Sequence, residues 1–220
     1  MRERYMEQLK KLHEELMQMG YLCQKAIGLA VDGMLTEDEE SCRQAILLAK
    51  ETDESEKTVE NLCLKMILQQ QPVASDLRKI SAGLKMVTDL ERMGDQAEDI
   101  GEIALGHNIG KWASKVELDA MAKEAISMVH KCVKAYVDSD LDLAREVIAQ
   151  DDVVDGYFDS IKEKLISMLD EDKTGAYIVD VLMVAKYLER IGDHAVNVGE
   201  WVEYAITGVH KGTPDQLPLC

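Results

Sequence analysis

Apolar residues follow a helical rhythm along most of the chain. In the first 30 residues they lie alternately three and four apart, at Leu9, Leu12, Leu16, Met19, Cys23, Ala26 and Ala30. The same spacing recurs over 118–135 and 154–168. It is typical of long helices that pack at shallow angles in an antiparallel bundle. No run of alternating β-branched residues reaches strand length, so the pattern predicts an all-α fold.

Breaks in this rhythm divide the chain into six expected helices, because Gly, Pro or small polar residues interrupt the apolar spacing. The helices are expected at about 3–33, 37–70, 74–105, 113–137, 140–169 and 175–207. Thr36, with Glu39 three residues on, is expected to cap the second helix, and Ser139, with Asp142, the fifth. Residues 208–220, which contain two Pro and two Gly, are expected to form an irregular tail.

A repeat organises these helices into two units. Residues 90–102 read LERMGDQAEDIGE, residues 188–200 read LERIGDHAVNVGE, and eight of the thirteen positions are identical at a separation of 98. Each copy falls in the third helix of a set of three. The sequence therefore predicts two tandem three-helix bundles related by duplication, at 1–108 and 109–207, followed by the tail at 208–220.

The chain is strongly acidic, with 42 Asp and Glu against 25 Lys and Arg and a net charge of −17. Such a charge repels phosphate backbones and anionic lipid headgroups, which argues against nucleic-acid binding and against direct membrane docking. It suits a basic protein partner or metal cations instead. The excess of acid is therefore the feature that a functional interpretation must explain.

Signals for secretion or membrane insertion are absent from the sequence. The charged start of the chain precedes no apolar signal region, and the longest apolar run, 176–188, is interrupted by Asp180 and Lys186. The five cysteines form no CxxC pair and fit free thiols in a reducing compartment. Four of them lie among apolar residues at helical spacing and are expected in the core. We therefore expect a cytoplasmic protein.

The repeated segment is unfavourable as helix, which suggests a site. Glu91 and Asp95 stack like charges four residues apart, and Gly94 lies between them. Carboxylates without sulfur and with little imidazole suit Mg²⁺, Mn²⁺ or iron. Gly would permit close approach of a neighbouring helix or a ligand. The candidate metal ligands are Glu91, Asp95 and Asp99 in the first repeat, Glu189 and Asp193 in the second, and Glu56, Glu60, Asp151 and Asp155 on the preceding helices.

The alternative is that these acids form solvated helix faces, with Arg92 and Arg190 neutralising them locally. The residues alone support both interpretations equally. His194 is expected beside the site rather than on the metal. Other chemistry finds no support, because no Glu-x-x-His motif of di-iron bundles, no phosphate loop and no nucleophile–base arrangement can be identified. An enzyme is not expected.

Three segments carry a resemblance to a known family. QQPVASDLR at 70–78, LERMGD at 90–95 and LERIGDHA at 188–195 resemble the PhoU family of phosphate-uptake regulators, and the likeness extends over almost the whole chain. It implies a duplicated three-helix bundle, a cytoplasmic location with recruitment to the inner face of the membrane through partners, and a homodimer. It also implies a negative regulator of phosphate uptake and phosphate-regulon signalling. Its partners would be the ATPase subunit of the phosphate ABC transporter and a sensor histidine kinase.

The resemblance further implies a metal-binding Glu/Asp-x-x-x-Asp motif that holds iron, zinc, Mn²⁺ or Mg²⁺. Glu91 with Asp95 and Glu189 with Asp193 match this motif clearly. Glu56 with Glu60 and Asp151 with Asp155 match it more loosely. Glu60 in place of the motif's Asp, and Asn197 in place of an acid equivalent to Asp99, predict that any asymmetry in metal occupancy favours the first unit.

Two other functions remain open at this stage. The chain could be a metal-binding or metal-buffering protein whose carboxylate clusters are themselves the function. It could also be a regulator of the same family that serves a different transporter or persistence physiology. Residues cannot separate this last possibility from the adaptor between a phosphate transporter and a histidine kinase.

Overall fold

The computed structural model describes residues 2–70, 72–169 and 175–209, and within them the chain is helical with short connections. The helices are α1 (Arg2–Thr36), α2 (Glu39–Gln70), α3 (Ala74–Gly106), α4 (Gly110–Ala113), α5 (Leu118–Asp138), α6 (Leu141–Ser167) and α7 (Gly175–Thr207). The predicted all-α fold is confirmed, and all six long helices appear. The short helix α4 was not expected.

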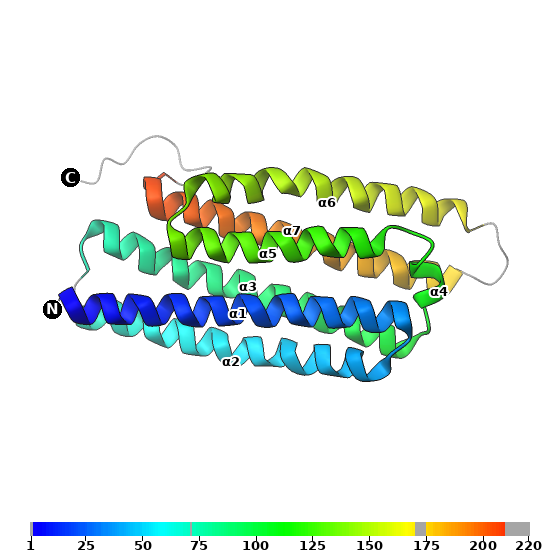
Figure 1. Cartoon of the computed structure of the whole chain (residues 1–220), viewed down its shortest axis with the longest axis horizontal. Coiled ribbons are helices and arrows are strands. Elements are labelled where there is room, and N and C mark those ends of the chain that lie inside the picture. The colour runs from blue at the N-terminus through cyan, green and yellow to red at the C-terminus, as the bar shows by residue number, and fades with distance from the viewer. Residues whose placement is uncertain (1, 71, 170–174, 210–220) are drawn as a thin grey trace.

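Two three-helix bundles, α1–α3 and α5–α7, lie side by side in the same elongated molecule (Figure 1). Helix α3 packs along α7 and helix α1 along α5, so the two bundles share a single hydrophobic core. The predicted core positions on α1 lie in it: Leu12, Leu16 and Met19 are fully buried. The expected boundary at residue 108 falls in the connection between α3 and α4.

The connection between the bundles is more structured than a linker. Ile109 and Ala113 are buried, and a Cβ on Gly110 would lie 2.5 Å from the carbonyl oxygen of Met34 at the end of α1. Short helix α4 is therefore held against the first bundle, and turns separate it from α5. For this reason α5 begins at Leu118, five residues later than the expected start at 113.

Both predicted helix caps are wrong by one or two residues. Thr36 ends α1, and the cap of α2 is Asp38, whose carboxylate accepts hydrogen bonds from the amide of Glu40 (3.1 Å) and the hydroxyl of Ser41 (2.7 Å). Ser139 lies beyond the C-terminus of α5 with a φ of 53°, and Asp140 caps α6 by accepting from the amide of Leu143 at 3.0 Å. Several cap-forming residues adjoin at each site, and spacing alone cannot choose among them.

The structure also bears on the expectations for the cysteines, for membrane spans and for the C-terminal tail. Cys23, Cys42, Cys63 and Cys132 are buried free thiols, as predicted, whereas Cys220 lies outside the described residues. No helix within the described ranges is long and apolar enough to cross a membrane. The expected irregular tail lies outside the described residues from His210 onward.

Candidate metal centre

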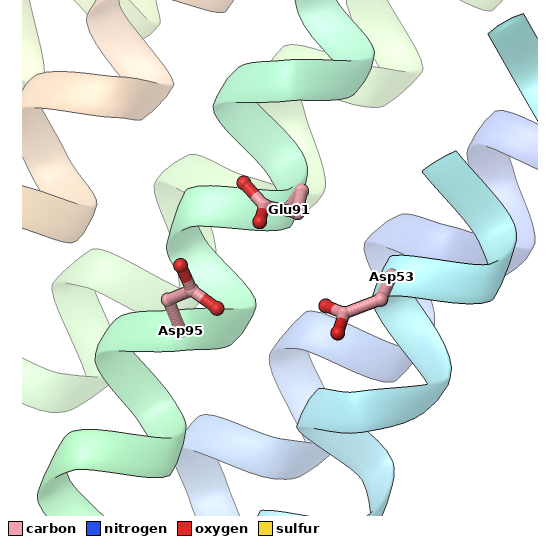
Figure 2. Close-up of side chains that lie close together, drawn as sticks. All are labelled: Asp53, Glu91 and Asp95. Carbon is pink, nitrogen blue, oxygen red and sulfur yellow. The ribbon is translucent and has the colours of Figure 1, made fainter. Parts of the chain in front are cut away.

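Three carboxylates from two helices converge in the first bundle (Figure 2). Glu91 and Asp95 are one turn apart on α3, and Asp53 on α2 faces them. One oxygen from each carboxylate lies within 4.8 Å of the other two. Among the described residues, no other His, Cys, Asp or Glu side chains form such a group. Sequence reasoning identified Glu91 and Asp95 but missed Asp53.

The electrostatics of this group favour a bound cation. Burial raises the pKa of Glu91 to about 7, and the negative charges of Asp95, Glu56 and Asp53 add to that shift. Burial and the Asp53 carboxylate likewise raise the pKa of Asp95, while Arg92 opposes the shift. Both carboxylates are therefore held in surroundings where the negative form is disfavoured. A positive ion between them would reverse this effect.

The donor set fits a hard cation. Three carboxylates supply oxygen ligands only, and oxygen ligands suit Mg²⁺, Mn²⁺ or iron. They suit Zn²⁺ less well, because zinc sites usually rely on thiolate and imidazole ligands. Asp53 and Glu91 are half-buried, whereas Asp95 is exposed, so one side of the group is open to solvent. Asp53, Glu91 and Asp95 would hold the ion, and remaining coordination positions would be filled from that side.

The other first-bundle candidates lie outside this group. Burial raises the pKa of Glu56, and a hydrogen bond from Thr88 opposes that shift. Neither Glu56 nor Glu60 belongs to the converging set. Both are therefore neighbours that add negative charge, and the α2 residue of the converging group is Asp53, one turn nearer the start of the helix.

Repeated glycines bring the helices of each bundle close together. A Cβ on Gly94 would lie 2.2 Å from the hydroxyl of buried Thr52 on α2. A Cβ on Gly192 would lie 3.3 Å from the Asp151 carboxylate and 3.4 Å from the Val154 side chain on α6. Of the two roles considered for these glycines, the structure shows close approach of a neighbouring helix.

These contacts also align the two bundles. Gly101 faces Ile46, and Gly199 faces Ile148, so equivalent residues of α2 and α6 are 102 apart, although those of α3 and α7 are 98 apart. By this alignment Asp155 corresponds to Asp53. Asp53 could have been identified from the sequence by aligning α2 with α6 separately from the α3–α7 repeat, because that alignment pairs it with the candidate ligand Asp155.

The second bundle holds its four candidate acids close to one another. Burial raises the pKa of Asp151 to about 6, and Asp155, Asp193 and Glu189 add to the shift. Within the part of the chain that the structure describes, these residues do not form a converging group of three. A cation is already present, because the ammonium group of Lys186 forms an ion pair with Glu189.

Asp99 and Asn197 face the contact between the two bundles. Burial raises the pKa of Asp99, and a hydrogen bond from Tyr187 on α7 opposes the shift. In the equivalent place, the Asn197 amide donates to the Asp89 carboxylate at 3.1 Å, and Nδ1 of His194 lies 2.9 Å from the same oxygen. Asn197 thus supplies a donor to α3. It is not simply a lost ligand, and His194 shares its partner Asp89.

The fold and the site together define a class: an all-α protein of two equivalent three-helix bundles, with an acidic cluster between the second and third helices of each. The PhoU domain family matches residues 16–104 and 118–202. The "phosphate-specific transport system accessory protein PhoU homolog" of Clostridium acetobutylicum is 39% identical over 91% of this chain and 93% of its own length. The Escherichia coli PhoU protein, another such accessory protein, is 28% identical over 91% of this chain and 84% of its own.

Solved structures agree with this assignment. The crystal structure of PhoU from Pseudomonas aeruginosa superposes with a TM-score of 0.84 at 27% identity, covering 93% of this chain and all of the other. The Streptococcus pneumoniae PhoU structure shares the fold, with a TM-score of 0.83 at 21% identity, covering 94% of this chain and 98% of the other. The chain belongs to the PhoU family.

Proposed function

We propose that this protein is a negative regulator of phosphate uptake and phosphate-regulon signalling. In this role it is a cytoplasmic adaptor between the ATPase subunit of a phosphate ABC transporter and a sensor histidine kinase. The supporting observation is the match, over nine-tenths of the chain, to accessory proteins of phosphate-specific transport systems. The acidic surface suits basic docking surfaces on such partners, so the binding should weaken with salt.

The metal centre is proposed as part of this adaptor. Asp53, Glu91 and Asp95 would hold an iron, zinc, Mn²⁺ or Mg²⁺ ion, and oxygen donors favour the harder ions of that set. The bound cation would neutralise the carboxylates and so fix helix α2 against helix α3. It would therefore supply structural order and positive charge, with no reaction of its own.

Deletion of the gene tests the regulatory proposal. Loss of the chain is expected to derepress phosphate-responsive genes in phosphate-rich medium, and the wild-type gene should restore repression. The purified chain should also retain the histidine kinase or the transporter ATPase in a pull-down that changes with phosphate. Normal repression in the deletion strain would refute the regulatory proposal.

The centre itself is tested with Glu91→Gln, which removes one charge but keeps the side-chain size. Mn²⁺ binding measured by calorimetry should be lost in this variant. Glu60→Gln is the matched control, because Glu60 lies on the same acidic surface but outside the converging group. Equal binding by both variants and the wild type would exclude this centre.

A metal buffer is the second candidate, and the convergence of Asp53, Glu91 and Asp95 favours it. A buffer should bind several ions per chain, and loading should leave partner binding unchanged. An adaptor should instead bind partners differently with and without metal. The homodimer is also a proposal, and sedimentation of the metal-loaded chain tests it.

A further inference from the structure

The two acidic clusters differ in one cation that belongs to the chain itself. Lys186 lies one turn before Glu189 on α7, and its ammonium group is paired with that carboxylate. The Glu189 side chain is only 15% exposed and that of Lys186 is 42% exposed, so the carboxylate end of this pair is largely buried while the lysine reaches it from the surface. Burial and neighbouring acids raise the pKa of both Asp155 and Asp193, and Lys186 opposes the shift in each case. Lys186 therefore acts on three of the four acids.

At the position equivalent to Lys186, the first bundle carries no ammonium. The residue 98 positions before Lys186 is Thr88, which is neutral and donates a hydrogen bond to Glu56. The residue 102 positions after Glu56 is Phe158, and the Lys186 ammonium lies 5.4 Å from the centre of its ring. The second cluster has Lys186 and Phe158 where the first has Thr88 and Glu56. At these two positions it therefore carries one more positive charge and one less negative charge than the first. An aromatic face also stabilises the added ammonium.

We propose that Lys186 is an internal counter-ion that takes the place of a metal ion in the second cluster, so that the chain loads metal in its first bundle alone. This inference rests on the proposed metal centre. It attributes the expected asymmetry in metal occupancy to a cation of the chain itself, whereas the sequence had attributed it to the substitutions at Glu60 and Asn197. The second cluster has four carboxylates, Asp151, Asp155, Glu189 and Asp193, so lack of ligands cannot be the reason.

Exchanging the two residues should move the metal. The experiment titrates the full-length purified chain with Mn²⁺ and measures stoichiometry by calorimetry and bound ion by electron paramagnetic resonance. The wild type should bind one ion. Lys186→Thr, which installs the first bundle's residue, should bind two, and Thr88→Lys should bind none. Adding Asp193→Asn to Lys186→Thr should return the count to one, which assigns the gained ion to the second cluster.

Lys162→Thr is the matched control. Its ammonium also lies beside the Phe158 ring, at 5.5 Å, and its removal changes the net charge equally. However, Lys162 is paired with the exposed carboxylate of Asp159 and not with Glu189. The control should therefore bind one ion. A gain of a second ion by Lys162→Thr would show that net charge alone sets the count and would overturn the proposal.

Stability in metal-free buffer gives a second measurement. Lys186→Thr should lower the urea midpoint more than Lys162→Thr does, because it leaves the carboxylates of Glu189, Asp155 and Asp193 without their cation. Mn²⁺ should restore the midpoint of Lys186→Thr to that of the metal-loaded wild type. Unchanged stability with no metal response in a folded Lys186→Thr chain would refute the role of Lys186.

The outcomes separate the two proposals. If the wild type binds one ion that Glu91→Gln abolishes, and Lys186→Thr also binds only one, the first-bundle centre stands and the role of Lys186 is refuted. If the wild type already binds two ions, Lys186 does not exclude metal. If the wild type binds none but Lys186→Thr binds one, the first-bundle centre fails while the counter-ion role is supported.

Discussion

The contact between Gly94 and Thr52 gives the sharpest test of the packing that builds the centre. Replacement of Gly94 by Ala would place a Cβ 2.2 Å from the Thr52 hydroxyl, far inside van der Waals contact. Thr52 is fully buried, and its hydroxyl donates to the carbonyl oxygen of Ala49 at 2.6 Å. The side chain must therefore rotate, which breaks this hydrogen bond, or helix α2 must move away from α3.

The expected change in unfolding free energy combines two destabilising effects and one stabilising effect. Overpacking a close-packed interior costs about 1–3 kcal/mol. Leaving a buried hydroxyl without its partner costs about 1–3 kcal/mol more. Replacing Gly by Ala within a helix stabilises the folded chain by about 0.5–1 kcal/mol. The net expectation for Gly94→Ala is a loss of about 3 kcal/mol of unfolding free energy, which at an m-value of about 3 kcal/mol/M lowers the urea midpoint by about 1 M.

Two other glycines provide a graded control within the same chain. A Cβ on Gly156, on the exposed face of α6, would meet nothing within 4 Å. Gly156→Ala should therefore stabilise the protein by about 0.5–1 kcal/mol. Gly192→Ala should fall between the other two, because its nearest contacts would be 3.3 and 3.4 Å away.

A double variant identifies the cause. If the clash with Thr52 is responsible, Thr52→Ala should recover about 2 kcal/mol of the loss caused by Gly94→Ala, since both the obstruction and the stranded hydroxyl are removed. The measurement is urea unfolding followed by circular dichroism, with m-values compared among all variants. Stabilisation of Gly94→Ala to the level of Gly156→Ala, or strict additivity with Thr52→Ala, would refute the reasoning.

Three further predictions concern pH, the contact between bundles and a helix cap. Because the pKa of Glu91 is raised to about 7 in the folded chain, metal-free stability should fall as pH rises from about 4.5 to 7, and Glu91→Gln should flatten the fall in urea midpoints measured with chelator. Asn197→Asp should lower stability by about 1 kcal/mol, because it sets a carboxylate against Asp89, and should leave Mn²⁺ stoichiometry unchanged. Asp140→Ala should cost about 1 kcal/mol in urea unfolding, whereas Ser139→Ala should stay within about 0.5 kcal/mol, the reverse of what cap spacing predicts.

The fold was predictable because helical periodicity is a local property. Leu12, Leu16 and Met19 follow the three-and-four spacing and are fully buried, so reading the spacing was enough to place them in the core. The connection between the bundles was not predictable in this way. Ile109 and Gly110 are fixed by contact with the end of α1, which is distant in sequence, and local spacing carries no information about such contacts.

The site was only half predictable, for a related reason. Glu91 and Asp95 share one helix, so their separation of four residues is sufficient to place both on the same face. Asp53 joins them through the packing of α2 on α3, and the register of that packing is set by Gly94 against Thr52. The repeat could not supply this register. The chain from Ile148 on α6 to Gly199 on α7 is four residues shorter than the chain from Ile46 on α2 to Gly101 on α3. A 98-residue shift therefore pairs the wrong residues of the second helices.

The correct register also changes what the charge of the chain means. With the 102-residue shift, Asp155 corresponds to Asp53, while Asp151 corresponds to neutral Ala49. The second bundle therefore has an acid equivalent to each of the three converging carboxylates, and the net charge of −17 does not by itself indicate where a cation binds. Burial raises the pKa of Glu91 and Asp95 in the first cluster and Arg92 opposes that shift, so what separates the clusters is a lysine paired directly with one of the carboxylates. In the first bundle the converging carboxylates include no paired lysine among the described contacts, and in the second Lys186 is paired with Glu189. Two copies of one motif thus carry equivalent acids and differ in whether a lysine is paired with them, which is the difference that the proposed counter-ion role of Lys186 uses.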